Sequence, residues 1–365
     1  MNVPKLRFKE FNDNYLRLKY KDVLKIKSGK DQKQVECENG IYPILGTGGQ
    51  IGKTNSFLYD KPSVLIGRKG TINKPQYMET PFWTVDTLFY SHIYEPNIPK
   101  YLFYSFQNVN WRKYDESTGV PSLISSTIEG VDCNIPSKEE QLKVAYFLSL
   151  LDKKIELQSK KIEDLKLFKL YLQNKLYNAN DTKDVLIKDL GEIVTGTTPS
   201  KSENKYWDNG NILWITPTDI CENRDINDCS CKLTESGLAK GRFIPKNSIL
   251  VTCIASIGKN AIIKEDGSCN QQINAIIPSK DYNYNYIYYM IENLSNYMKS
   301  IAGTSATAII NKEQFGNINI KIHKREVQDK ISKILNAFET KIIQEGFKYK
   351  KLQNLKKGLM QNMFV

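Results

Sequence analysis

The sequence predicts an α/β (α+β) protein built by tandem duplication, in which two globular domains are joined by two long antiparallel coiled-coil helices. Residues 135–177 recur without a gap as residues 322–364, which lie 187 positions later. Both copies space apolar residues in alternating steps of four and three, and this spacing is typical of a coiled-coil seam. Each copy follows a long segment of short apolar runs interrupted by glycine and proline.

The alternation of globule and helix sets the predicted domain boundaries. We assign residues 1–138 to the first globular domain and residues 139–180 to the first helix with its polar linker. Residues 181–322 form the second globular domain, and residues 323–365 form the second helix. If each helix carries one globule, a single chain gains approximate two-fold symmetry.

The first globular domain is expected to mix strands and helices. Tyr42–Leu45, Ser63–Gly67 and Thr84–Tyr90 are short apolar runs with the composition of strands. Lys100–Phe106 follows a proline and is expected to be helical. The second globular domain repeats these features weakly: residues 188–200 resemble 21–33, residues 249–263 resemble 63–73, and residues 286–291 resemble 100–105.

Polar residues interrupt both helical seams at equivalent positions, Gln158 and Lys169 in the first copy and Glu345 and Lys356 in the second. An antiparallel pair can set Gln158 near Lys356 and Lys169 near Glu345. A parallel pair would set Lys169 against Lys356, and burying two like charges together is costly. We therefore predict antiparallel pairing in that register. The alternative is that both lysines extend into solvent from two unrelated amphipathic helices.

Composition favours a polyanionic partner. The formal net charge is +12 and the sequence pI is about 9.1, a balance that favours nucleic acid, although a lysine-rich solvated surface gives the same numbers. No apolar run approaches the roughly 20 residues that span a membrane. The polar N-terminus lacks a signal-peptide pattern, so a cytoplasmic location is expected. The seven cysteines are an odd number, which favours reduced thiols.

The sequence offers no catalytic, metal or cofactor constellation. The run at residues 46–54 resembles a phosphate-binding loop, but Thr47 stands where the first glycine is needed and Pro62 follows soon after. The late cysteines lack the paired spacing of a zinc site. Glu203 and Lys205 form a nuclease-like tripeptide without an upstream partner.

What remains is a set of basic, amide and aromatic side chains at expected turns. Arginine suits guanine edges, asparagine and glutamine suit adenine edges, and lysine mostly contacts phosphates. The candidate DNA-binding residues are Lys53, Arg68, Lys69, Lys74, Arg112, Lys113, Tyr114, Lys201, Lys205, Tyr206, Trp207, Arg242, Lys259, Asn270, Gln271 and Gln272. The best candidate for base reading is the run Asn270–Gln272.

The whole architecture resembles the DNA specificity subunit of type I restriction–modification enzymes. The resemblance rests on GIYPILGTGG, IGRKGTI and PFWTVDTLFY in the first globule, and on GEIVTGTTPS, WITPTDI, NQQINAIIP and AGTSATAIINKEQF in the second. The first helix entry carries the family's Pro136, Glu140 and Gln141. The second departs from it, with His323 for proline and Val327 for glutamate, and this leaves its entry turn open.

The resemblance implies two target recognition domains that each read one half of a split DNA site, with the helices as spacer. It implies that catalysis lies in partners: two methyltransferase (M) subunits using S-adenosylmethionine, and restriction (R) subunits using ATP and Mg. It implies no cofactor in this chain and no membrane association. Two alternatives remain, namely a coiled-coil scaffold without useful DNA reading, and an NTPase based on the loop at Thr47.

Overall fold

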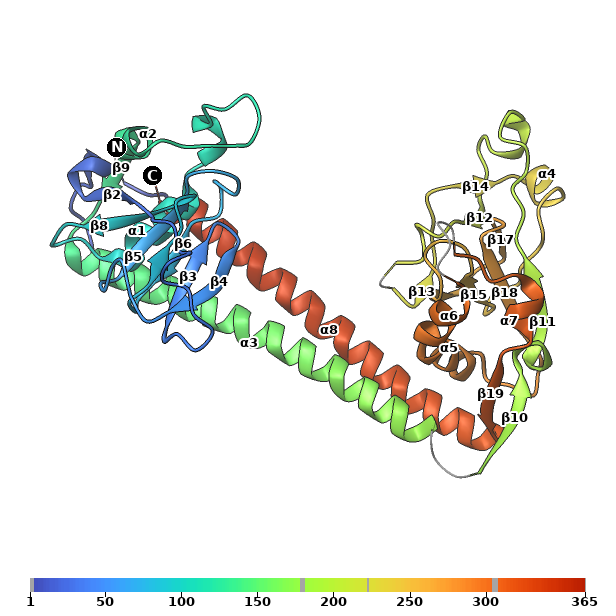
Figure 1. The fold of residues 1–365 in the computed structure, drawn as a ribbon. Coiled ribbons are helices and arrows are strands. Elements are labelled where there is room, and N and C mark those ends of the chain that lie inside the picture. The colour runs from blue at the N-terminus through green and yellow to red at the C-terminus, as the bar shows by residue number, and fades with distance from the viewer. Residues whose placement is uncertain (1–2, 178–180, 222, 304–307, 365) are drawn as a thin grey trace. The chain divides into compact units, whose positions relative to one another are not determined.

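Figure 1 shows the fold of the chain as a computed structural model, which describes residues 3–177, 181–221, 223–303 and 308–364. The chain divides into two compact units, one of residues up to 160 with those from 347 onward, and one of residues 161–346. Each unit contains one globule and a portion of both long helices. These helices are α3 (Lys138–Tyr177) and α8 (Arg325–Met363).

The first globule contains a strand pair and two small sheets. β1 (Leu16–Lys19) pairs antiparallel with β9 (Asp132–Ile135), which leads into α3. One sheet has the order β2-β8-β5-β6 and the other β4-β3-β7. Their strands are β2 (Leu24–Ser28), β3 (Tyr42–Gly46), β4 (Gly49–Thr54), β5 (Ser63–Gly67), β6 (Gln76–Met78), β7 (Trp83–Thr84) and β8 (Leu88–Ile93).

The strand predicted at Thr84–Tyr90 is therefore two strands in different sheets. The backbone N–H of Leu88 donates to the carbonyl of Val85, and this turn separates β7 from β8. Helix α1 (Pro99–Asn108), which extends the predicted Lys100–Phe106, packs on β5 and β6, and α2 (Ser125–Gly130) lies against β2.

The second globule contains the same kinds of elements. β10 (Thr182–Leu186) pairs antiparallel with β19 (Asn319–His323), which leads into α8. One sheet has the order β11-β18-β15-β16-β13 and the other β14-β12-β17. The elements are β11 (Gly191–Thr195), β12 (Ile212–Ile215), β13 (Asp225–Ile226), β14 (Lys232–Leu233), β15 (Ile249–Thr252), β16 (Asn260–Ile263), β17 (Gly267–Cys269), β18 (Ile273–Pro278), α4 (Glu235–Leu238), α5 (Tyr284–Asn293), α6 (Ser295–Ile301) and α7 (Lys312–Gly316).

The strand orders confirm the predicted duplication of the globules. β2-β8-β5-β6 corresponds to β11-β18-β15-β16, all antiparallel, with β13 as an addition in the second globule. In the smaller sheets, β3 pairs parallel with β7, as β12 does with β17. The sequences of the globules diverged while this pairing was retained.

One glycine in each globule shows why a short motif survived that divergence. Gly29 and Gly196 occupy equivalent positions in the two similar stretches, and each passes against the backbone at the end of a facing strand, β7 or β17. A Cβ on Gly29 would lie 2.0 Å from the carbonyl oxygen of Val85, and one on Gly196 would lie 2.2 Å from that of Asn270. No side chain fits at either position, so only glycine permits this close approach.

The two long helices pair antiparallel within each unit, as predicted. In the second unit Lys161 pairs with Glu345 and Lys169 with Glu339, so rising numbers on α3 meet falling numbers on α8. In the first unit Lys356 of α8 pairs with Asp152 of α3.

The predicted register is wrong by about two helical turns. Lys169 was expected beside Glu345 and Lys356 beside Gln158, whereas Lys169 contacts Glu339 and Lys356 contacts Asp152. The prediction sought partners for each lysine only among the polar residues that interrupt the opposite seam. Asp152 and Glu339 flank the seam, and the long lysine side chains reach their carboxylates there. Acidic residues beside a seam were not considered as partners.

The entry turns of the two helices are the same, which resolves the departure at His323. Gln141 accepts a hydrogen bond from the Ile98 N–H at the start of α1 and donates to the Pro136 carbonyl. Gln328 accepts from the Asn283 N–H at the start of α5 and donates to the His323 carbonyl. The glutamine needs only the backbone carbonyl of residue 136 or 323, so the side chain there can differ.

His323 closes β19 opposite Thr182 and does not belong to the helix predicted at 323–365. The predicted linker residues 178–180 lie outside the described residues, and β10 of the second globule begins at Thr182.

We predict that Gln141→Leu and Gln328→Leu each destabilise the unit that contains them. Both glutamines are buried, at 2% and 1% exposure, and each substitution leaves one N–H and one carbonyl without a partner. An unpaired buried polar group costs about 1–3 kcal/mol, so we expect about 2–4 kcal/mol per substitution. Hydrogen exchange at the Ile98 and Asn283 amides measures the effect. Exposed Gln344→Leu is the control, and protection equal to that of the control would contradict the prediction.

Candidate nucleic-acid interface

The glycine-rich run at residues 46–54 is a hairpin. β3 ends at Gly46, β4 begins at Gly49, and the two strands pair antiparallel across Thr47–Gly48. A phosphate-binding loop instead joins a strand to a helix N-terminus, and the described residues after Thr54 lead through a loop to β5. Lys53 lies on β4, opposite Pro43, and is exposed.

A loop cluster in the first globule brings several predicted residues together. The N–H of Arg68 donates to the Thr87 carbonyl at 2.8 Å, and the Arg68 carbonyl accepts from the Leu123 N–H at 2.9 Å. The backbone of Lys69 forms an isolated antiparallel β-bridge with that of Ser122. These contacts fix the backbone of the loop while both cationic side chains stay exposed. We call this set, residues 68–70 with 112–122, the first loop cluster.

Arg112, Lys113 and Tyr114 belong to the same cluster. They form a 3-10 helix (Trp111–Tyr114) whose Trp111 is buried in the core, so the three following side chains are exposed. Asp115 accepts hydrogen bonds from the N–H groups of Ser117 and Ser122, and these bonds lower the pKa of its carboxyl. The carboxylate thus folds the loop back toward Arg68 and Lys69. Lys74 lies elsewhere, near Gln107 and Lys356 beside the long helices.

The second globule presents a comparable set, the second loop cluster, formed by residues 196–207 and 269–273. The Thr197 N–H donates to the Cys269 carbonyl, and the Thr198 hydroxyl donates to Oε1 of Gln271 at 2.5 Å. The Trp207 indole donates to the Ser200 carbonyl, and its ring packs edge-on against Trp214 at 4.9 Å. Lys201, Lys205 and Tyr206 lie on the same segment, and Lys205 pairs with Glu203.

Asn270, Gln271 and Gln272 have different roles in the turn they form. Asn270 is 9% exposed, and its side chain accepts from the Gln272 N–H and donates to Oε1 of Gln272. These bonds occupy the Asn270 amide inside the protein. Gln271 is exposed at the turn. The run predicted as a base reader therefore presents Gln271, while Asn270 shapes the turn.

The last two predicted residues lie near this cluster. The Arg242 N–H donates to the Ser268 hydroxyl just before the turn. Lys259 lies on the turn after β15, where the Cys253 N–H donates to the Gln272 carbonyl. Both side chains are exposed.

The described residues contain no group of three or more His, Cys, Asp or Glu side chains that could hold a metal ion. All seven cysteines are free. Burial raises the pKa of Cys133 and of Cys269 to about 12, so both remain protonated thiols. No helix of the described residues is long and apolar enough to cross a membrane.

Sequence reasoning missed the residues that attach each globule to the helices, chiefly Tyr104 and Tyr289. The match of 286–291 with 100–105 was one residue out of register: residues 98–108 and 283–293 align at an offset of 185, with Tyr101 over Tyr286 and Tyr104 over Tyr289. It also missed Thr198, which orients Gln271. A lone threonine in a loop carries no sequence signal for that role.

The fold and the two loop clusters define a class of protein: a duplicated chain with one pair of long helices and two exposed clusters of basic and aromatic side chains, the second of which also carries amide side chains. The chain belongs to the family of the type I restriction modification DNA specificity domain, whose model matches residues 12–167 and 180–354. The double match agrees with the internal repeat.

Curated relatives carry the same description. The type I restriction enzyme MjaIX specificity subunit of Methanocaldococcus jannaschii is 32% identical over 185 residues, which cover 49% of this chain and 43% of that protein. The EcoR124I/EcoR124II specificity subunit of Escherichia coli is 34% identical over 166 residues, which cover 42% and 40%. The matched part thus spans about two fifths of each relative's length.

Solved structures share the fold over nearly the full chain. An S subunit of a type I restriction–modification system from M. genitalium has a TM-score of 0.69 at 16% identity, covering 100% of this chain and 99% of that one. A chain from a study of assembly and conformational transition in a type I R-M system has a TM-score of 0.62 at 11% identity, covering 96% and 97%.

Proposed function

We propose that this chain is the sequence-reading subunit of a type I restriction–modification complex. Each globule reads one half of a split DNA site, and the helical pair separates the two readers. The observation that carries the proposal is the duplication: two equivalent folds each present an exposed loop cluster with basic side chains, accompanied in the second globule by amide side chains. Such a pair fits a target with two half-sites better than one continuous site.

The chemistry of each loop cluster supports DNA recognition. Lysines and arginines bind phosphates and set the register, while Arg68 and Gln271 offer the forked donors and acceptors that base edges require. The backbone of Arg68 is fixed by two hydrogen bonds, and Gln271 is oriented by Thr198. Side chains held in this way lose little conformational freedom when they bind.

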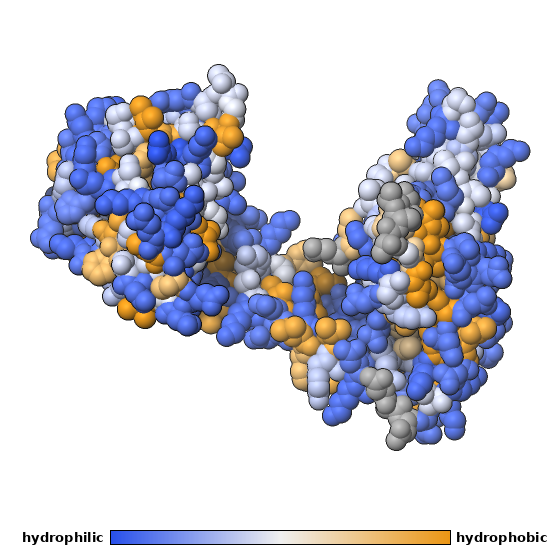
Figure 2. Space-filling model, viewed as in Figure 1, coloured by the Kyte–Doolittle hydropathy of each residue, from blue (hydrophilic) through white to orange (hydrophobic). Residues whose placement is uncertain are grey.

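Exposed apolar side chains on the helices support protein partners. Phe168 and Leu355 occupy equivalent positions of the repeat and are 49% and 51% exposed, and Phe147 and Ile334 form a second equivalent pair at 36% and 44%. Figure 2 shows hydrophobic residues grouped on the helical segment visible in that view. Because each position occurs twice, we propose that two methyltransferase subunits dock on the helices and that restriction subunits join that complex.

The proposal assigns catalysis to those partners. S-adenosylmethionine would be held by the methyltransferase subunits, and ATP and Mg by the restriction subunits. The flipped target adenine would enter a partner's pocket. A DNA target would also place the complex in the cytoplasm.

The second candidate is a scaffold that joins partners through the helices without reading DNA. The exposed apolar positions just described favour it as much as they favour the first. The two differ in salt dependence, because several phosphate contacts make DNA affinity fall steeply as salt rises. The hairpin at Thr47–Gly48 gives no support to an NTPase, and Lys53→Ala should leave any ATP affinity of the chain unchanged.

The test is a genome-wide map of methylated bases in a host that carries the neighbouring methyltransferase gene, with and without this chain. We expect a split motif with a non-specific gap that disappears when the chain is removed. Gln271→Ala should then relax one base pair of one half-site, whereas exposed Gln344→Ala should not. Methylation that is identical without the chain, together with DNA binding insensitive to salt, would contradict the proposal and leave the scaffold.

A further inference from the structure

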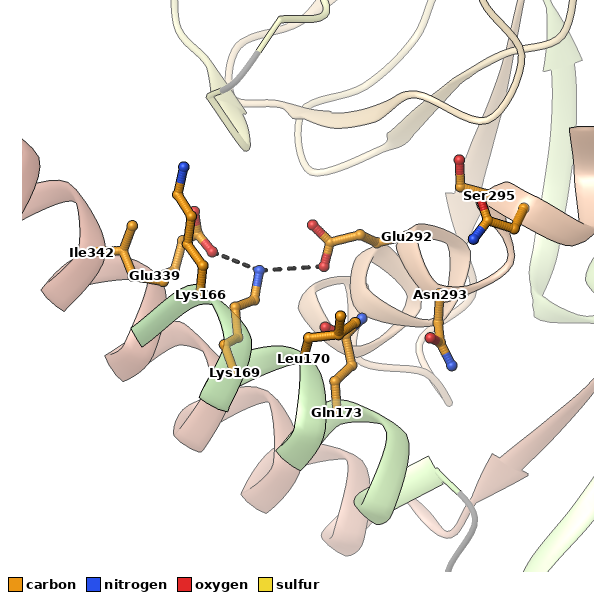
Figure 3. A pocket seen from close by; sticks show the side chains of 10 residues that line it. Lys166, Lys169, Leu170, Gln173, Glu292, Asn293, Ser295, Glu339 and Ile342 are labelled. Atoms are coloured by element: carbon orange, nitrogen blue, oxygen red, sulfur yellow. Dashed lines mark hydrogen bonds and ion pairs between the residues drawn. The ribbon is translucent and has the colours of Figure 1, made fainter. Parts of the chain in front are cut away.

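One lysine of the second unit is enclosed where three elements meet. Nζ of Lys169, on α3, lies 2.7 Å from a carboxylate oxygen of Glu339 on α8 and 3.2 Å from one of Glu292 on α5. It also lies 4.9 Å from the ring centroid of Tyr289 on α5. Figure 3 shows the ammonium between the two carboxylates. The Lys169 side chain is 11% exposed, so these partners replace most of the water around its ammonium.

The first unit contains the same arrangement. Lys356, on α8, pairs with Asp152 on α3, and its Nζ lies 3.3 Å from Oε1 of Gln107 on α1. Its Nζ lies 5.2 Å from the ring centroid of Tyr104, also on α1. The Lys356 side chain is 17% exposed.

The two arrangements are equivalent residue by residue in the internal repeat. The helix offset of 187 converts Lys169 into Lys356 and Asp152 into Glu339. The offset of 185 between α1 and α5 converts Tyr104 into Tyr289 and Gln107 into Glu292. A cation, an acid, a polar acceptor and a tyrosine were therefore retained twice, in globules whose sequences otherwise drifted. We call each set a junction clamp.

Each clamp joins the globule to both helices through directional bonds. The Tyr104 hydroxyl donates to Asp152 at 2.7 Å, and the Tyr289 hydroxyl donates to Asn336 at 2.8 Å. Burial is the main cause that raises the pKa of both tyrosines, so each stays a donor. In the second unit Gln173 also donates to the Tyr289 carbonyl.

Apolar packing alone tolerates small rotations of one surface on another, because it is not directional. A buried lysine does not tolerate such rotations, because its charge would be left unpaired in a poorly solvated site. Buried ion pairs add little net stability compared with apolar side chains of the same size, and their best-attested use is to fix a register. The ammonium is satisfied only when α3, α8 and the globule's helix hold one relative orientation.

We propose that Lys169 and Lys356 are positioning residues that fix the angle of each globule on the helical pair, and that they thereby set the gap allowed between the two half-sites. The proposal rests on the proposed DNA-reading function. Neither lysine contacts DNA in this scheme. Each acts through the globule it orients, so the half-site sequences do not depend on it.

The test maps methylated sites for Lys169→Met, Lys356→Met and the double variant in the assembled complex. Methionine keeps the stem of the side chain and removes the charge. We expect unchanged half-sites, with methylation at sites whose gap differs by one base pair rising on the order of tenfold, since angular error displaces the reading loops. Lys169→Arg keeps the cation and should restore the wild-type gap. The control is Lys153→Met, at an exposed lysine that pairs with Glu156 on its own helix.

Two outcomes would overturn the proposed role of the two lysines. One is a gap distribution unchanged from wild type. The other is a uniform loss of methylation at every gap that Lys169→Arg does not rescue, which would show a merely structural role.

A second measurement keeps the clamp testable if the wild-type chain gives no split motif and the proposed function fails. Spin labels on genetically encoded side chains at Lys240, in the second globule, and Lys333, on α8, report an electron–electron distance distribution within the second unit of the full chain. Lys169→Met should broaden that distribution and Lys169→Arg should not. Distance distributions of equal width in wild type and Lys169→Met would overturn the proposed role of Lys169.

Discussion

Inserting one heptad into each long helix is expected to move methylation to DNA sites whose gap is about three base pairs longer. Seven residues add about 10.5 Å of helix, and successive base pairs are about 3.4 Å apart. Suitable positions are between Lys160 and Lys161 on α3 and between Gly346 and Phe347 on α8, because the two compact units meet there in the chain. Both clamps and both globules keep their own contacts.

The control is insertion into α3 alone. Within the units, Lys356 meets Asp152 and Lys169 meets Glu339. A heptad in one helix only makes these two registers incompatible, so we expect methylation to be lost rather than shifted. The readout is the methylated-site map of the assembled complex. A double insertion that methylates the original gap would show that the helices do not set it.

Replacing Glu140 by leucine is expected to destabilise the first unit by about 3–5 kcal/mol, because it breaks a buried ion pair and leaves its cation behind. The Arg7 guanidinium contacts Glu140 through Nε at 2.9 Å and Nη2 at 2.8 Å, and the Tyr15 hydroxyl donates to the same carboxylate at 2.8 Å. The side-chain exposure of Glu140 is 1% and that of Arg7 is 14%. The substitution removes the acceptor for all three bonds.

Because these bonds hold the N-terminal arm against the first turn of α3, the arm should detach when they are lost. Limited proteolysis between Arg7 and Tyr15, together with hydrogen exchange of the strand pair β1–β9, measures the change. Asp132→Asn is the control, since Asp132 pairs with Arg17 at an exposed site where ion pairs contribute little. Cleavage of Glu140→Leu no faster than cleavage of Asp132→Asn would contradict the prediction.

The candidate site was only partly predictable from the sequence. Residue type and expected turns identified Arg68, Lys69 and Gln271, and the structure brings each of them to an exposed loop. The same criteria also selected Asn270, whose amide is used inside the turn, and Lys74, which lies beside the long helices. An exposed amide and a buried one look alike in a sequence, because the difference depends on which backbone groups surround them.

The sequence by itself determined the duplication, the two long helices and their antiparallel pairing, because periodic apolar spacing is a local property that survives when individual residues drift. Only the tertiary structure decided the register of the helices and the attachment of the globules. Lys169 is satisfied by Glu339, Glu292 and Tyr289, and the last two belong to a helix of the globule. Long flexible side chains choose partners by distance in space, and that distance is fixed only after the apolar cores of the two units have packed.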